Sequence, residues 1–284
     1  MRFVQYRILT RLLNDLTIPE YIHAFEKNKS IPVMARLHTN KKVVLSLDLK
    51  DFFHSIKQKT VKEILESLGA ASLPARTLSE ICTYKSFVPQ GALTSPKIAN
   101  IITAKTFGPV VKEYCAQKGL TLTIYADDIT MSSNTPGLDI PEILEDVYRI
   151  VRSFGFRINF LKTKVMTSSR RQYVCGVVVN TKTNMLKKDR YKLRAIVHNI
   201  VNNGVESEAT KSNLSPLEFI SYIKGRINWF KQLNPDLGGR LYNKLDTYLT
   251  VSQIVPNITL AVPEQNLTEN DEIQVDEPVP WENS

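Results

Sequence analysis

Cysteine is scarce in this sequence of 284 residues, and its three copies, Cys82, Cys115 and Cys175, are widely spaced. An odd number without a C-x-x-C pair favours neither a disulfide framework nor a zinc site. The pattern is typical of a reduced protein, and we expect a cytoplasmic location. No apolar run approaches the roughly 18 residues that span a bilayer, and Arg7 interrupts the stretch after Met1, so the sequence predicts neither membrane insertion nor a signal peptide.

Basic residues are missing from the last 24 residues, Ala261–Ser284, which carry seven carboxylates. Because the formal net charge of the chain is +9, the rest of it carries +16. A body this basic suits a polyanionic partner such as a nucleic acid, although many basic domains only have a well-solvated surface. From residue 256 to residue 284, the acidic, proline-bearing composition predicts a flexible tail.

Hydrophobic periodicity predicts helices that alternate with a few short strands. We expect helices at Phe3–Leu16, Thr60–Leu68, Pro74–Tyr84, Ser95–Gln117 and Pro141–Ser153, and a helical unit at Lys188–Leu249 with breaks at Gly204, Pro216 and Pro235. We expect strands at Val43–Leu49, Leu120–Tyr125, Ile129–Ser132 and Phe156–Phe160, and a strand pair within Tyr173–Asn180. The segment with Lys27, Lys29 and Pro32 is expected to be a loop.

Three aspartates stand at strand ends where a core would not need them. Asp48 falls near the end of an apolar strand, and Asp127 and Asp128 form the tip of a predicted hairpin. Asp48 alone is better explained as a turn-forming residue, and an adjacent pair of aspartates is also common in ordinary tight turns. If the strands lie side by side, however, their carboxylates can hold two Mg²⁺ ions, which activate an attacking hydroxyl and stabilise a leaving pyrophosphate.

Sequence blocks around these aspartates resemble a known family. The successive A, B and C blocks of reverse transcriptases are similar to Val44–Ile56, Pro89–Pro96 and Tyr125–Asp128, and their D block is similar to Gly155–Thr163. The resemblance extends over roughly 240 residues, from Tyr6 to Leu249. It implies an RNA-directed DNA polymerase that uses dNTPs and two Mg²⁺ ions, for which Mn²⁺ can substitute.

The family has an α+β right-hand polymerase fold with palm, fingers and a helical thumb. The resemblance assigns the fingers to 1–42 and 57–86, the palm to 43–56 (block A) and 87–186 (blocks B to E), the helical thumb to 187–255 and the flexible acidic tail to 256–284. Family members usually carry a basic strand pair ahead of the first helix, and this sequence starts inside or just after it. Triphosphate binding is then expected of Arg36, Lys41, Lys42 or Lys50.

Within this family, the sequence resembles the retron reverse transcriptases of bacteria. His23–Ile31 and Ala35–His38 are similar to the segment ahead of block A, where Met34 replaces the usual Asn of an Asn-Ala-x-x-His motif. Val174-Cys175-Gly176 stands where retron enzymes have Val-Thr-Gly, a segment implicated in RNA recognition. The resemblance implies a cognate structured non-coding RNA, a branched RNA–DNA product (msDNA) and a separate effector protein in antiphage defence.

Residue roles are carried over from the matching blocks. The catalytic residues are Asp48, Asp127, Asp128 and Lys162, and the metal ligands are Asp48, the backbone of Leu49, Asp127 and Asp128. The nucleotide site comprises Asp51, Phe52, Phe53, Gln90 and Gly91. The expected nucleic-acid contacts are His38, Tyr125, Val174, Cys175, Gly176, Lys188, Arg190, Tyr191, Arg194 and Arg226.

Several of these residues also have a purely structural interpretation. Phe53 is either the steric gate that excludes a 2′-hydroxyl or part of the core. Lys162 is either a proton donor to pyrophosphate or a solvated lysine. His38 either stacks on RNA or makes structural hydrogen bonds, and Tyr125 either touches the primer terminus or packs. In the helical unit, Trp229 and its neighbour are either stacking residues or thumb core.

Two other functions fit the same sequence. The enzyme could belong to a group II intron, a diversity-generating element or an abortive-infection system. Alternatively, the chain could be a non-catalytic RNA-binding scaffold that holds an effector protein. The presence of all three aspartates argues against the scaffold.

Overall fold

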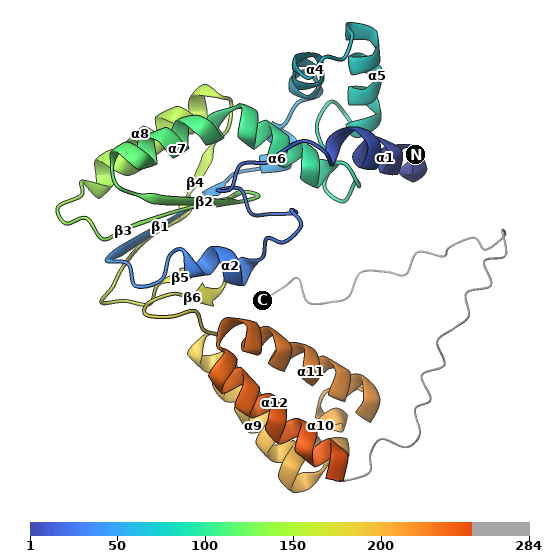
Figure 1. Ribbon diagram of the computed structural model, residues 1–284, viewed down its shortest axis with the longest axis vertical. Helices are drawn as coiled ribbons and strands as arrows, with labels where there is room; N and C mark the ends of the chain where they lie inside the picture. Colours follow the sequence, from blue (N-terminus) through green and yellow to red (C-terminus); the bar gives the residue numbers. More distant parts are fainter. Residues whose placement is uncertain (252–284) are drawn as a thin grey trace, which may run out of the picture. The chain divides into compact units, whose positions relative to one another are not determined.

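The computed structural model describes residues 1–251, so the predicted acidic tail lies outside the described residues. The chain divides into two units, and the first, Met1–Leu245, holds every site discussed below. Helices and strands are mixed in it, which agrees with the predicted α+β class (Figure 1). In the part of the chain that is described, no helix is both long and apolar enough to cross a membrane.

A four-stranded antiparallel sheet organises the first unit. Its strand order is β2-β3-β1-β4, with β1 at Val43–Leu49, β2 at Thr121–Tyr125, β3 at Asp128–Ser133 and β4 at Ile158–Thr167. Leu45, Leu47 and Ile129 are buried in the main apolar core on one face. Helices α7 (Phe107–Gln117) and α8 (Ile140–Ser153) cover that face (Figure 1). The other face is left for polar side chains.

Helix α8 shows how local sequence sets these elements. Its N-cap, Asp139, accepts a hydrogen bond from the backbone N–H of Glu142, and Pro141 occupies the first turn. Ile143 and Val147 recur at a spacing of four and are buried against the core.

The prediction of a single helix at Ser95–Gln117 is wrong. The structure has α6 (Ser95–Lys105) and α7, separated at Thr106, whose φ of −119° and ψ of −114° are not helical. A Cβ atom on Gly108 would lie only 2.4 Å from the carbonyl oxygen of Thr103. The break therefore brings two backbone segments into a contact that only glycine permits.

The first 82 residues hold short helices, some of them unexpected. They are α1 (Arg2–Ile8), a π-helix η1 (Leu9–Leu13), α2 (Ile31–Arg36), α3 (Phe52–Ser55), α4 (Gln58–Ser67) and α5 (Ser72–Cys82). The predicted helix from Phe3 to Leu16 is thus shorter and changes to π geometry. Helix α2 replaces a predicted loop, and Pro32 in its first turn favours a helix start there.

The C-terminal helices are separated at the breaks that Gly204, Pro216 and Pro235 led us to expect. They are α9 (Lys187–Asn203), α10 (Val205–Lys211), α11 (Pro216–Leu233) and α12 (Pro235–Val251). Ser215 and Glu218 form a capping box at the start of α11. Between β4 and α9, the predicted strand pair is confirmed as β5 (Tyr173–Val174) and β6 (Val177–Val178).

Candidate active site

The polar face of the sheet carries a row of four opposed residues. Tyr125 on β2 pairs with Asp128 on β3, Asp128 pairs with Asp48 on β1, and Asp48 pairs with Asn159 on β4. Directly opposed residues of antiparallel strands point to the same face, with Cβ atoms about 4.5–5.5 Å apart. The acids of blocks A and C are therefore neighbours in space, as the sequence predicted.

Asp127 lies in the two-residue turn that joins β2 to β3. The first turn residue, Ala126, has a φ of +52°, a left-handed conformation that hairpin turns usually give to glycine. The backbone N–H of Leu49 donates to the carbonyl of Asp127 at 2.8 Å. This bond ties the turn to the end of β1 and keeps Asp127 beside Asp48.

Negative charge accumulates at this site. Burial raises the pKa of Asp127, and the charge of Asp48 raises it further. Burial also raises the pKa of Asp128, and the charges of Asp127 and Asp48 act in the same direction. Three half-buried carboxylates therefore repel one another, and a cation placed among them would relieve that repulsion.

One lysine reaches these carboxylates from β4. The ammonium of Lys162 lies 3.2 Å from Asp48 Oδ2, while its side chain stays 64% exposed. The register between β1 and β4 shifts between Ser46 and Asp48, where the four residues 160–163 of β4 lie opposite Leu47 alone. A bulge re-aims side chains, and this one directs Lys162 toward block A.

Cys175 contacts one of the acids from the hairpin of β5 and β6. Cys175 and Gly176 form the turn between β5 and β6, and both have positive φ, at +45° and +79°. This is the pattern of a type I′ hairpin turn. The thiol of Cys175 lies 3.7 Å from Asp128 Oδ2, and burial raises the pKa of the thiol to about 12, helped by the charge of Asp128. Val174, the first residue of the Val-Cys-Gly segment, is buried.

The donor set fits the predicted magnesium ions. Among residues 1–251, no three His, Cys, Asp or Glu side chains are gathered as ready ligands of one ion. Asp48 instead faces Lys162, and Asp128 faces Cys175. The three carboxylates are nevertheless hard oxygen donors on adjacent strands and their connecting turn, and one lysine, Lys162, only partly offsets their negative charge, which is an environment that suits Mg²⁺. Asp48, Asp127 and Asp128 remain the predicted ligands.

The predicted nucleotide-site residues follow β1 and precede α6. Phe52 is buried, with its ring centroid 5.7 Å from that of Phe156, whereas Phe53 is only half-buried. Phe52 therefore belongs to the core, and Phe53 keeps an accessible ring for the predicted gate role. Asp51 and Gly91 have φ of +51° and +87° and are exposed.

Gln90, the remaining residue predicted for the nucleotide site, is exposed beside Gly91. Of the basic residues expected near the triphosphate, Arg36 donates to the carbonyl of Gln232 at 2.9 Å. Lys50 follows β1 directly and is exposed. Lys50 lies within block A, whereas Arg36 precedes it and contacts the backbone of α11. The choice among the four stays a prediction.

His38 makes structural hydrogen bonds and is not available to stack on RNA, which were the two predicted alternatives. Its side chain is fully buried, and its two ring nitrogens lie 2.7 Å from Ser132 Oγ and 2.8 Å from Thr123 Oγ1. Both hydroxyls belong to the polar face of the sheet. The structure therefore corrects His38 to the structural alternative, in which it fastens the segment after α2 beneath the sheet.

A basic groove of about 770 Å³ lies between α9 and α12. It combines two predicted residues, Arg190 and Arg194, with Arg240 and Lys244, which sequence reasoning missed. Arg240 and Lys244 are four residues apart on α12 and therefore lie on the same face of the helix. This spacing could have indicated a basic helix face in the sequence. Aromatic and apolar walls complete the groove, including Tyr191 and Phe230.

Lys188 and Arg226, the other residues of the helical unit that were predicted to contact nucleic acid, do not line this groove. Lys188 is exposed on the first turn of α9. Arg226 on α11 donates to the hydroxyl of Tyr222 at 3.0 Å. Phe230 is buried and Trp229 half-buried, so at least one of this pair is core.

Comparison with known proteins agrees with this geometry. Residues 1–207 match the family model described as reverse transcriptase (RNA-dependent DNA polymerase). The chain belongs to this reverse transcriptase family. The family membership expected from blocks A to D is thereby confirmed. The catalytic role of Asp48 and Asp128 stays a prediction.

Curated relatives of this reverse transcriptase are described as retron reverse transcriptases. It is 32% identical over 201 residues to the retron Ec86 reverse transcriptase of Escherichia coli, covering 70% of this chain and 62% of that one. It is 30% identical over 262 residues to the retron Mx65 reverse transcriptase of Myxococcus xanthus, covering 85% and 58%. The chain thus spans about three fifths of the length of these relatives. The resemblance to retron enzymes is confirmed.

Proposed function

We propose that this chain is a retron-type reverse transcriptase that copies part of a cognate structured non-coding RNA into DNA. The product is a branched RNA–DNA hybrid (msDNA), primed from the 2′-hydroxyl of an internal guanosine. We include a role in antiphage defence with a separate effector protein. The observation that supports the proposal most directly is the pairing of Asp48 with Asp128 on adjacent strands, beside Asp127 and Lys162.

The proposed chemistry assigns a task to each of these residues. The priming hydroxyl loses its proton to solvent and attacks the α-phosphorus of a dNTP, so that one P–O bond forms while the bond from that phosphorus to pyrophosphate breaks. Asp48, Asp127 and Asp128 would hold two Mg²⁺ ions, or Mn²⁺ in their place, which would supply Lewis-acid activation of the hydroxyl and charge stabilisation of the leaving group. Lys162 donates a proton to the departing pyrophosphate.

Substrate binding is assigned to the surfaces around the acids. The half-buried ring of Phe53 selects dNTPs over rNTPs, and Gln90 and Gly91 line the nucleotide pocket. The groove with Arg190 and Arg240 holds phosphates of the RNA or of the hybrid, because cations beside aromatic rings suit both the backbone and the bases. These tasks follow the fingers, palm and thumb division expected from the sequence.

The test is to express the chain with its flanking intergenic DNA and to recover the nucleic acid bound to it. The matched control carries Asp127→Asn and Asp128→Asn. A discrete DNA that shortens with RNase and is absent from the control would support the proposal. Bound RNA without DNA would support the scaffold instead, and heterogeneous DNA that needs no local RNA would support an abortive-infection enzyme.

A further inference from the structure

Phe25 combines backbone strain with exposure. Its φ of +59° lies in the left-handed region, which is unfavourable for a bulky side chain. The ring gains little from burial, because the residue is 51% exposed. A strained aromatic residue that is half in solvent is not explained by packing, and strain of this kind concentrates at functional sites.

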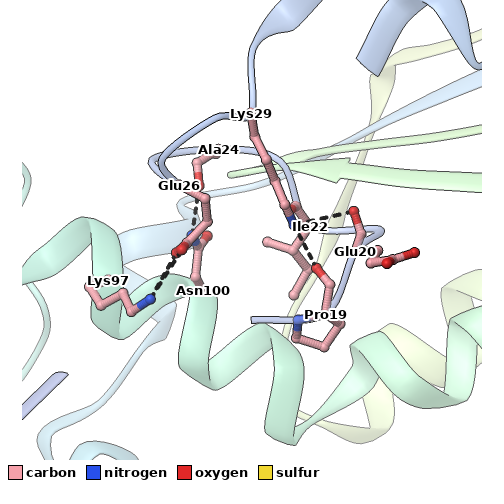
Figure 2. Close-up of polar contacts among 8 residues, drawn as sticks. All are labelled: Pro19, Glu20, Ile22, Ala24, Glu26, Lys29, Lys97 and Asn100. Atoms are coloured by element: carbon pink, nitrogen blue, oxygen red, sulfur yellow. Dashed lines mark hydrogen bonds and ion pairs between the residues drawn. The ribbon is translucent and has the colours of Figure 1, made fainter. Parts of the chain in front are cut away.

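The chain before and after Phe25 is held in place by Lys29. The ammonium of Lys29 donates to the carbonyls of Pro19, Glu20 and Ile22 at 2.9, 3.3 and 2.6 Å (Figure 2). One side chain thus satisfies three backbone acceptors of the loop. The segment between residues 19 and 29 is thereby closed on itself.

A second set of contacts grips the residues on both sides of Phe25. Asn100 on α6 donates to the carbonyl of Ala24 at 2.6 Å and to the carboxylate of Glu26 at 2.9 Å. Glu26 also pairs with Lys97 at 3.1 Å, and both side chains are largely buried (Figure 2). The neighbours of Phe25 are therefore fixed, and the strained conformation between them is imposed by the surrounding structure.

The same segment is joined to the edge of the sheet next to the active site. The backbone N–H of Ile124 donates to the carbonyl of Tyr21 at 2.7 Å, and the N–H of His23 donates to the carbonyl of Ile124 at 2.8 Å. This places Phe25 beside Tyr125, with ring centroids 6.4 Å apart and planes at 40°. Tyr125 is the end of the row of opposed residues, so Phe25 extends that row by one ring.

We propose that Phe25 is a substrate-contacting residue, whose ring forms with Tyr125 a stacking platform for the nucleobase at the priming end of the nucleic acid. The inference rests on the proposed polymerase function. Tyr125 is opposed to Asp128, so a base on this platform would keep the priming hydroxyl near the carboxylates. Stacking on an aromatic ring tolerates every base, as a polymerase requires.

The test uses Phe25→Gly, Phe25→Trp and, as a matched control, Phe3→Ala, because Phe3 is an aromatic residue 70% exposed on α1. Glycine adopts positive φ freely, so Phe25→Gly is expected to raise Tm. The same variant should bind a short RNA template–DNA primer hybrid about tenfold more weakly, since one stacked base is lost. The affinity of Phe25→Trp for the hybrid should be within about twofold of the wild-type affinity. The affinity of Phe3→Ala should equal that of the wild type.

Affinity is measured by fluorescence anisotropy, and primer extension separately gives the KM for dNTP. Unchanged hybrid affinity in Phe25→Gly would overturn the inference, as would a fall in Tm that parallels the loss of affinity. An effect confined to the KM for dNTP would overturn it as well. If the wild-type chain extends no primer on an RNA template, the proposed function fails. If the wild type extends the primer and the Phe25 variants bind and extend it equally well, only the inference about Phe25 fails.

Discussion

The ammonium of Lys162 and the carboxylate of Asp48 lie 3.2 Å apart although the residues are separated by 114 positions in the chain. An ion pair with a lysine that is 64% exposed adds little to stability, because solvent screens it. The contact is therefore better explained by the chemistry at Asp48 than by folding. It also joins two sequence blocks that were matched to the family separately.

Replacing Lys162 with Ala should slow nucleotide addition about a hundredfold, the usual contribution of a general acid. The neighbouring Lys164, whose ammonium lies 4.9 Å from the ring centroid of Tyr173, provides the control. Lys164→Ala should keep a rate close to that of the wild type. Single-turnover rates with an RNA template measure both, and equal losses in the two variants would contradict the assignment.

Asp128→Asn should abolish most DNA synthesis and, without metal, increase stability. The activity loss is expected to reach at least about a hundredfold, as for other removed electrostatic stabilisers. Stability should rise because burial and the charges of Asp127 and Asp48 raise the pKa of Asp128, so its ionised form is unfavourable in the fold. Thermal unfolding in EDTA and in Mg²⁺ checks this: added Mg²⁺ should stabilise the wild type more than the variant.

Arg240→Ala and Lys244→Ala should weaken RNA binding through the groove between α9 and α12. Each lost phosphate contact should reduce the slope of log affinity against log salt by about 0.7–0.9. Lys59→Ala is the control, since Lys59 is an exposed lysine on α4 that lies 3.8 Å from Glu63. Filter binding over a salt series measures the slopes, and an unchanged slope in the groove variants would exclude these two phosphate contacts.

Acid should destabilise the protein through its buried histidines. Burial lowers the pKa of His38 to about 3 and that of His23 to about 4. The unfolded chain binds these protons near pH 6.5, so stability is fully present above that pH and falls as the pH drops toward 4. The slope is about 1.4 kcal/mol per pH unit for each histidine. Urea unfolding of His38→Gln should lose about 2 kcal/mol less than the wild type between pH 7 and pH 5; an equal loss would contradict the burial argument.

Gly108→Ala should destabilise the fold, because its Cβ would lie 2.4 Å from the carbonyl oxygen of Thr103. The expected cost is about 1–3 kcal/mol, as for other overpacked sites. Gly225→Ala on α11 is the opposite case, since a Cβ there meets no atom within 4 Å. That variant should gain about 0.5–1 kcal/mol from helix propensity. Urea unfolding compares them, and a stable Gly108→Ala protein would show that α7 can shift away from Thr103.

Much of the site was accessible from the sequence because its signals are local. The apolar run ending near Asp48, the hairpin tip at Asp127 and the helix breaks at Gly204, Pro216 and Pro235 depend on nearby residues. The resemblance to reverse transcriptases also rests on contiguous blocks. The order of these blocks identified the family before any contact was known.

Other features depended on contacts between distant segments. Sequence determined that the acids exist, whereas strand register decided that Asp128 opposes both Asp48 and Tyr125. Burial under the sheet decided between the two uses of His38, and the loop fastened to α6 imposed the strained conformation of Phe25. Local propensity sets elements within a few residues, while register and burial arise only when segments far apart in the chain pack together.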